Sequence, residues 1–188
     1  MAQARTLDEA QIKRLQRYSR KRRNHTRDST IFTFAFNTGL RAKELAALCV
    51  GDAYDAEGAV LDAFVLQRSQ TKGARTHTVY INRTLRVALE QYRPTLYSVE
   101  PTAPLFESRK GGHFSANTMC QLFLTVFADC GLRGATSHTP RRTFITQLAN
   151  KGMGVRVLAE LAGHSSIAVT QRYIDVNDAQ LARAVELL

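Results

Sequence analysis

The sequence passes from one predicted helix to the next through the stretch Thr38-Gly39-Leu40-Arg41-Ala42-Lys43-Glu44. Residues 29–38 are apolar and aromatic, which predicts a buried helix. Gly39 is a plausible end for this helix, because glycine readily adopts the left-handed backbone of a helix C-terminus. A second helix is expected to begin near Arg41. The stretch therefore predicts two consecutive helices with an arginine at their junction.

The rest of the chain predicts a mainly α-helical fold with one small antiparallel β-sheet, an α+β class. A capping box at Thr6-Leu7-Asp8-Glu9 predicts an N-terminal helix. Strands are expected over residues 60–66 and 77–81, and the polar turn between them puts Lys72 near a hairpin tip. Further helices are expected over residues 84–93, 115–130, 139–151, 154–162, 166–173 and 177–187.

Composition favours a polyanionic partner. The chain has 188 residues and a net charge of +10, and arginine supplies 20 of its 26 basic residues. Guanidinium groups bind phosphate bidentately and stay charged, so nucleic acid is a natural partner. A merely basic, soluble surface is the alternative that charge alone leaves open.

Length and cysteine usage point to one cytoplasmic domain. A chain of 188 residues suggests a single domain with at most a short appendage. It has no run of eighteen apolar residues and no charged-then-apolar leader, so we expect neither membrane insertion nor secretion. Cys49, Cys120 and Cys130 are odd in number and lack metal-ligand spacing, which indicates reduced core cysteines.

Two further motifs carry residues suited to phosphodiester chemistry. One is His138-Thr139-Pro140-Arg141, and the other is Gly163-His164, followed nine residues after the histidine by Tyr173. Cleaving DNA without a metal needs fixed cations for the charge on phosphate, a general acid for the leaving oxygen and a nucleophile. The acidic residues are scattered without an evident pair, which argues against a metal nuclease.

Each of these residues has an ordinary structural alternative. Arg41 and Arg141 could clamp a phosphate, but a single arginine is more often in a structural ion pair. Glu44 lies three residues after Arg41 on the same helix face, so it could orient that arginine or simply pair with it. Lys72 could donate a proton or be an exposed turn lysine, and one of six tyrosines is usually core or surface.

Taken together, five ordered motifs resemble the catalytic domain of the tyrosine recombinases, also called phage integrases. The resemblance runs from about residue 25 to the end of the chain. The motifs are Thr38-Gly39-Leu40-Arg41 with Glu44, Lys72-Gly73, His138-Thr139-Pro140-Arg141-Arg142-Thr143-Phe144, Leu161-Ala162-Gly163-His164-Ser165 and Thr170-Gln171-Arg172-Tyr173.

The resemblance implies a site-specific DNA recombinase, acting in integration, excision or inversion. Tyr173 would attack the scissile phosphate of double-stranded DNA and form a 3′-phosphotyrosyl link, with neither metal, ATP nor other cofactor. Arg41 and Arg141 would stabilise the transition state, and Lys72 would protonate the leaving oxygen. His138 would help to move the tyrosine proton. His164 would hydrogen-bond the phosphate, and Glu44 would support the site.

The sequence departs from the family pattern in two places. Pro140 stands where the family usually has leucine, a change that the first turn of a helix tolerates. Residues 1–27 offer one helix and the basic cluster Arg20-Lys21-Arg22-Arg23, too little for the N-terminal core-binding domain that closes the DNA clamp in most members. Residues 28–188 would then be the catalytic domain, either excised or resembling the short single-domain recombinases that invert fimbrial promoters.

The last segment, residues 177–188, predicts an amphipathic helix with Leu181, Val185 and Leu188 on one side. It could pack on its own domain. In the family such a tail often docks on a neighbouring protomer, which implies a tetramer on DNA.

Two other functions stay open at this point. A type IB topoisomerase would share the chemistry without exchanging strands between partners. A catalytically silent DNA-binding regulator would need no nucleophile, so replacing Tyr173 with phenylalanine distinguishes it from a recombinase.

Overall fold

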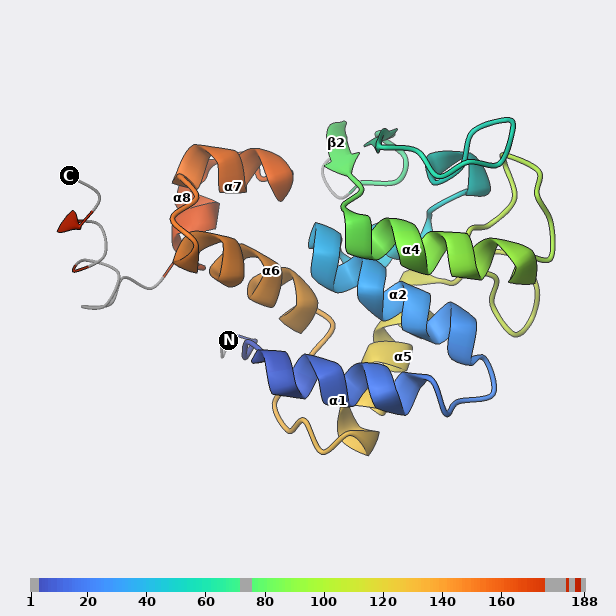
Figure 1. Ribbon diagram of the computed structural model, residues 1–188, viewed down its shortest axis with the longest axis horizontal. Helices are drawn as coiled ribbons and strands as arrows, with labels where there is room; N and C mark the ends of the chain where they lie inside the picture. Colours follow the sequence, from blue (N-terminus) through green and yellow to red (C-terminus); the bar gives the residue numbers. More distant parts are fainter. Residues whose placement is uncertain (1–3, 72–75, 175–181, 183–184, 187–188) are drawn as a thin grey trace.

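A buried helix, α2 (His25–Thr38), runs through the centre of the fold (Figure 1). The computed structural model describes residues 4–71, 76–174, 182 and 185–186. Most α2 side chains are buried, because other helices cover several of its sides. Two of its buried threonines bond back to the helix: the Thr30 and Thr38 hydroxyls donate to the Thr26 and Phe34 carbonyls, each at 2.8 Å. The prediction of a buried helix ending at Gly39 is confirmed.

Two helices flank the start and the end of α2. Helix α1 (Glu9–Ser19) packs along α2, and the short helix α3 (Ala42–Ala46) follows Gly39. The predicted N-terminal capping box is displaced by two residues. Asp8, not Thr6, caps α1, since its carboxylate accepts from the Gln11 backbone N–H at 2.8 Å.

The small sheet is antiparallel, as expected, but its strands are shorter than predicted. Strand β1 (Ala63–Leu66) pairs with β2 (His77–Tyr80), with Leu66 opposite His77 and Phe64 opposite Val79. Successive side chains alternate between faces, so His77 and Val79 point inward while Tyr80 is 62% exposed. Lys72, predicted near the hairpin tip, is outside the described residues.

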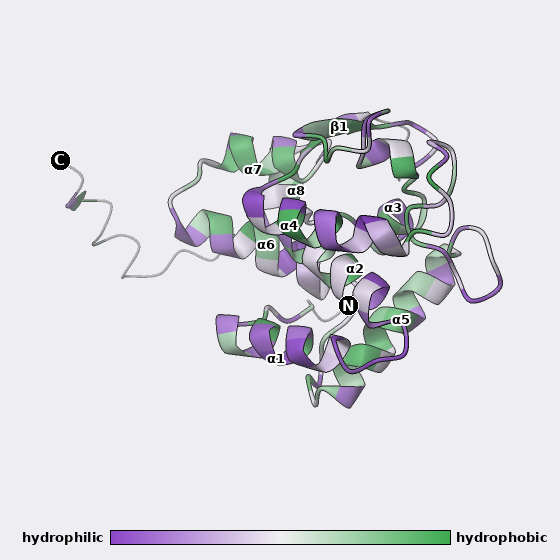
Figure 2. Cartoon of the chain, turned by 45° about the vertical axis from the view of Figure 1, so that its right-hand side comes forward, coloured by the Kyte–Doolittle hydropathy of each residue, from purple (hydrophilic) through white to green (hydrophobic). Residues whose placement is uncertain are grey.

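Helices α4 (Arg83–Tyr92) and α5 (Ala116–Asp129) pack on opposite parts of the central core. Ser115 caps α5 as predicted, because its hydroxyl accepts from the Thr118 N–H at 3.0 Å. Phe32 of α2 meets Phe123 of α5 edge to face, with ring centroids 4.9 Å apart. Figure 2 shows the contrast along the core: α5 carries much green, whereas α1 is mostly purple.

Three helices complete the described chain: α6 (Thr139–Asn150), α7 (Val155–Leu161) and α8 (Ile167–Gln171). They gather on one side of the molecule (Figure 1), where α6 packs on α2 and α7 packs on β2. Short 3₁₀ turns at Val50–Asp52 and Arg93–Thr95 lie in the connections on the other side. The predicted helix over 177–187 falls almost entirely outside the described residues.

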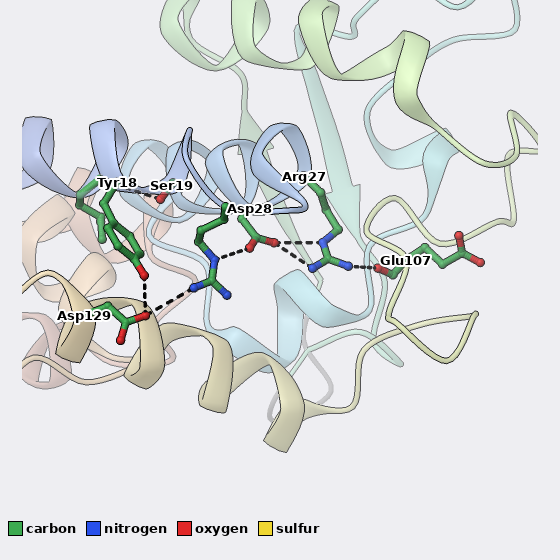
Figure 3. A network of polar contacts seen from close by, with 8 residues as sticks. Tyr18, Ser19, Arg27, Asp28, Glu107 and Asp129 are labelled. Atoms are coloured by element: carbon green, nitrogen blue, oxygen red, sulfur yellow. Dashed lines mark hydrogen bonds and ion pairs between the residues drawn. The ribbon is translucent and has the colours of Figure 1, made fainter.

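The loop between α1 and α2 is held by a network of charged groups (Figure 3). Asp28, 1% exposed, accepts from Arg22 Nε at 2.8 Å and from Arg27 Nη2 at 2.9 Å. Asp129 on α5 accepts from the Tyr18 hydroxyl at 2.7 Å and lies 3.5 Å from Arg22 Nη1. The network ties α1, α2 and α5 together.

The three cysteines are free thiols, in agreement with the sequence analysis, although only Cys130 is fully buried. Across the part of the chain that the structure describes, no helix has the length and apolar character needed to span a membrane.

Candidate active site

Arg141 connects two motifs that lie far apart in the sequence, the one at Gly39 and the one at Ala162. It projects from the first turn of α6 and is 2% exposed. Its Nη1 donates to the carbonyl of Gly39 at 2.9 Å, and its Nη2 donates to the carbonyl of Ala162. Both acceptors are backbone atoms, and the nearby Glu44 carboxylate bonds to Arg41 instead, so no carboxylate among the described residues is hydrogen-bonded to this guanidinium. The positive charge stays available for another anion.

Gly39 allows α6 to approach the end of α2. Its φ is +67°, and a Cβ built there would lie 2.6 Å from Phe144 on α6. A larger residue would strain the backbone and also separate the two helices. The glycine thereby holds its carbonyl where Arg141 can reach it.

Arg41 is fixed by Glu44, one turn later. Glu44 is fully buried, and its two carboxylate oxygens accept from the Arg41 backbone N–H at 2.7 Å and from Arg41 Nη1 at 2.8 Å. The Arg41 side chain is 24% exposed. Glu44 therefore orients Arg41 and leaves part of the guanidinium facing outward.

His164 and Tyr173 lie together after α7. Their rings stack with centroids 5.6 Å apart and planes inclined by 22°. His164 Nδ1 is 2.8 Å from the hydroxyl of the buried Thr170, which fixes the orientation of the imidazole. The segment from 164 to 173 thus presents histidine and tyrosine as one unit.

Tyr173 is docked against its own domain. Its carbonyl accepts from the Thr146 hydroxyl at 3.1 Å, and its ring packs beside Ile145, Leu158 and Ala162. The phenol also lies close enough to Arg141 to act on the pKa of that residue. Nucleophile candidate and buried arginine therefore face each other within one chain.

Three buried polar side-chain atoms lack a hydrogen-bond partner within the described structure: Arg141 Nε, His164 Nε2 and His77 Nε2. All three belong to this one region. Leaving a buried donor unpaired costs about 1–3 kcal/mol, and such groups are rare. Their gathering at one place indicates a site built for a ligand with several acceptor oxygens.

The charges of the site act strongly on its histidines. Burial, followed by the charges of Arg141 and Arg41, lowers the pKa of His164 to about 4. His164 is therefore neutral at pH 7 and can donate one hydrogen bond. Burial, together with the charge of Arg41, also lowers the pKa of Arg141, but a guanidinium remains charged at neutral pH.

The structure brings together five of the residues singled out in the sequence: Arg41, Glu44, Arg141, His164 and Tyr173. His138 is the N-cap residue of α6, three residues before Arg141, and is exposed. Lys72 falls outside the described residues.

Sequence reasoning missed two residues of this region. The first is Thr170, whose hydroxyl bonds to His164. It stands in the motif Thr170-Gln171-Arg172-Tyr173 but was assigned no role from the sequence. His77 lies against Gly163, with its Nδ1 2.7 Å from the position of a glycine Cβ. The alternation of β2 was a usable signal, because it places His77 on the same inward face as Val79.

This arrangement of helices around a two-stranded hairpin is the fold of known DNA recombinases and integrases. The XerA recombinase superposes with a TM-score of 0.78 at 23% identity, covering 99% of this chain and 66% of that one. The Tn1549 transposon integrase, solved in complex with a circular intermediate DNA, gives 0.78 at 18% identity, covering 100% and 67%. The fold class predicted from the sequence is confirmed.

The sequence model of the phage integrase family matches residues 5–180, and the chain belongs to this family. Its relatives include tyrosine recombinase XerC of Methylobacterium sp. (strain 4-46), 31% identical over 162 residues. XerC of Brucella suis biovar 1 is 32% identical over 160 residues. These alignments cover 85% and 82% of this chain but only 49% and 48% of the relatives. The chain thus spans about half the length of the relatives it matches.

Proposed function

We propose that this chain is the catalytic part of a tyrosine site-specific recombinase, which cleaves and rejoins double-stranded DNA. One observation carries the proposal. Tyr173 lies beside Arg141 and His164, in a site where three buried polar atoms have no partner among the described residues. A scissile phosphate supplies the negative charge and the acceptor oxygens that such a site needs.

In the first step, the Tyr173 phenol oxygen attacks phosphorus, and the bond from phosphorus to the 5′ oxygen breaks. The DNA 3′ end becomes a phosphotyrosyl ester, and the 5′ end leaves as a hydroxyl. His138 accepts the phenol proton, directly or through water, and Lys72 gives a proton to the leaving oxygen. Arg41 and Arg141 bind the non-bridging oxygens, where charge accumulates.

In the second step, a 5′ hydroxyl attacks the phosphotyrosyl ester and releases Tyr173. The ester conserves the energy of the broken bond, so rejoining needs neither ATP nor a metal. His164 donates a hydrogen bond to the phosphate in both steps, and Glu44 keeps Arg41 in position. Which 5′ hydroxyl attacks decides between restoring the original strand and exchanging it.

We assign residues 28–188 to the catalytic domain and residues 1–27 to an N-terminal helix and basic segment. This segment is tied to α6, because the Leu7 backbone N–H donates to the Thr143 hydroxyl at 3.0 Å. We infer that the chain works in the cytoplasm as a tetramer on DNA, with protomers joined through the C-terminal helix. Arg20-Lys21-Arg22-Arg23 and the net charge of +10 favour contact with the phosphate backbone.

The test is to mix the chain with nicked duplexes of random sequence and to recover protein–DNA adducts that resist SDS. The nick lets the short fragment with the 5′ hydroxyl diffuse away, so the phosphotyrosyl link accumulates. Sequencing the trapped DNA then gives the preferred site. Tyr173→Phe is the matched control, since it removes one oxygen and keeps the ring.

We expect adducts from the original chain and none from Tyr173→Phe. DNA binding without adducts from either protein would instead identify a silent DNA-binding domain. Relaxation of supercoiled plasmid without site preference would identify a topoisomerase.

A further inference from the structure

We propose that His77 is a further residue of the active site, whose Nε2–H donates a hydrogen bond to a non-bridging oxygen of the phosphate attacked by Tyr173. The proposal rests on the function proposed above. It adds to Arg41, Arg141 and His164 a donor from strand β2 of the sheet.

The position of His77 in β2 directs its ring toward the site. It shares the inward face of the strand with the buried Val79, and its cross-strand partner Leu66 is fully buried. Helix α7 packs against this strand. The ring therefore lies on the inward face of the strand, with its Nε2 buried.

His77 contacts the turn at Gly163, which lies between Ala162 and His164. Gly163 has a φ of +59°, and a Cβ there would lie 2.7 Å from His77 Nδ1 and 2.9 Å from its Cγ. The carbonyl of Ala162, one residue earlier, accepts from Arg141, and His164 follows one residue later. His77 thus touches the turn that positions two phosphate-binding candidates.

His77 is in the same hydrogen-bonding state as Arg141 and His164. Its Nε2 is buried and has no partner in the described part of the chain, a state it shares only with Arg141 Nε and His164 Nε2 there. A histidine that served packing alone could expose this atom or bond it to a carbonyl. A common ligand accounts for all three atoms, provided that DNA binding uncovers them.

The electrostatics of the region favour a neutral donor at this position. Burial lowers the pKa of His77, with Arg141 and Arg41 acting in the same direction while Glu44 and Glu160 oppose them. His77 therefore carries one ring proton at neutral pH. A third cation beside two guanidinium groups would be repelled, whereas a neutral imidazole can still donate to phosphate.

Two variants separate hydrogen bonding from packing. His77→Phe keeps a ring against Gly163 but has no donor, and His77→Gln offers an amide N–H near the place of Nε2. Thr78→Val is the matched control, because Thr78 is exposed on the other face of the same strand. Thermal unfolding and DNA binding are measured for every variant, so that rates are compared only between folded proteins.

The readout is the rate of adduct formation on a nicked duplex carrying the site recovered from the random library. We expect His77→Phe to be about 10²-fold slower, the order found when one preorganised donor is removed. His77→Gln should recover most of this loss, and Thr78→Val should react like the original chain.

A second substrate tests the contact itself. In a methylphosphonate, a methyl group replaces one non-bridging oxygen of the scissile phosphate. With the diastereomer that lacks the oxygen bound by His77, the original chain and His77→Phe should react at the same rate. A residue that acts only through packing would slow the phosphate and both diastereomers by the same factor.

The outcomes distinguish this proposal from the function on which it rests. If the original chain forms no adduct, the proposed function fails and this inference fails with it. If adducts form and His77→Phe matches the original chain, or slows all three substrates equally, only the role of His77 is overturned. If neither His77→Phe nor the smaller His77→Leu folds, His77 is a packing residue and the proposal is wrong.

Discussion

Both ends of α2 gather arginines, and the two clusters differ in what their guanidinium groups bind. At the start of the helix, Asp28 accepts from Arg22 and Arg27 (Figure 3). At its end, Arg141 donates to the Gly39 and Ala162 carbonyls and interacts with the Tyr173 phenol, and its Nε has no partner within the described residues. The charged groups of the first cluster are paired with one another, whereas the second cluster keeps a buried donor without a partner among the described residues.

The arginine pKa values record this difference. Burial works against the charge of Arg22, but hydrogen bonding and the charge of Asp28 outweigh it, so the pKa of Arg22 is raised. For Arg141, burial and the charge of Arg41 prevail, and the pKa is lowered.

A cavity of about 1100 Å³ adjoins the first cluster and is lined by several basic residues. Because Arg22 and Arg27 already share a carboxylate, the cavity is not a second copy of the active site. Unsatisfied groups, rather than basic residues as such, distinguish a ligand site.

The largest expected effect comes from exchanging arginine for lysine in each cluster. Arg141→Lys keeps the charge but loses the planar fork that spans the Gly39 and Ala162 carbonyls and the phosphate. We expect adduct formation to fall by at least about 10³-fold. Arg27→Lys, in the satisfied cluster, should leave the rate of the folded protein unchanged. Equal losses of rate in both variants would contradict the distinction between the two clusters.

Asp28→Asn should have the opposite pattern of effects to Arg141→Lys: it should lower stability and leave the rate of adduct formation unchanged. This change leaves Arg22 and Arg27 without their buried carboxylate, which should lower the free energy of unfolding by about 3 kcal/mol. The rate of adduct formation per folded molecule should not change. Urea unfolding measures the loss, and Asp129→Asn provides a comparison, because Asp129 is 40% exposed and should cost less.

A third comparison uses two glycines with similar backbone angles. Gly163→Ala and Gly131→Ala both place a side chain at positive φ, +59° and +66°, and each should cost about 1–3 kcal/mol. Only Gly163 faces a neighbour, His77, whereas no atom lies within 4 Å of a Cβ at Gly131. Gly163→Ala should therefore also slow adduct formation, and Gly131→Ala should not. A slow Gly131→Ala protein would show that backbone strain alone limits catalysis.

The smallest expected effect is a pH dependence of stability. The folded-state pKa of His164, about 4, lies below the ordinary histidine value of 6.5, so the unfolded chain binds more protons between these limits. Stability is therefore full above about pH 6.5 and declines as the pH falls toward 4. We expect the Tm to drop by a few degrees between pH 7 and pH 5, at roughly 2–4 °C per kcal/mol. His164→Gln should reduce this drop.

Much of the fold was readable from local sequence. Ser115 and Gly39 marked helix ends correctly, because a cap or a left-handed residue depends only on its neighbours. The same local rules placed the first cap at Thr6, since they could not tell that Asp8 would take the role. Strand ends were overestimated, because where pairing stops depends on residues elsewhere in the chain.

The site was readable only in part. Motif spacing singled out Arg41, Arg141, His164 and Tyr173, which the fold then brought together. It gave no sign that Arg141 would be held by the Gly39 and Ala162 carbonyls, because a backbone acceptor leaves no trace in side-chain identity. His77 escaped notice for a related reason: its contact with Gly163 depends on how α7 packs against β2.

The position of Arg141 also bears on when the proposed active site is assembled during synthesis. Its two carbonyl acceptors lie 102 residues before it and 21 residues after it. During synthesis the N-terminal part emerges and begins to fold first. A chain that has emerged only through α5 presents its basic segment and most of its core, but it has neither the arginine nor the tyrosine. Under the proposed function, the ability to break a DNA strand therefore arises late in synthesis, when Arg141 connects the Gly39 and Ala162 carbonyls.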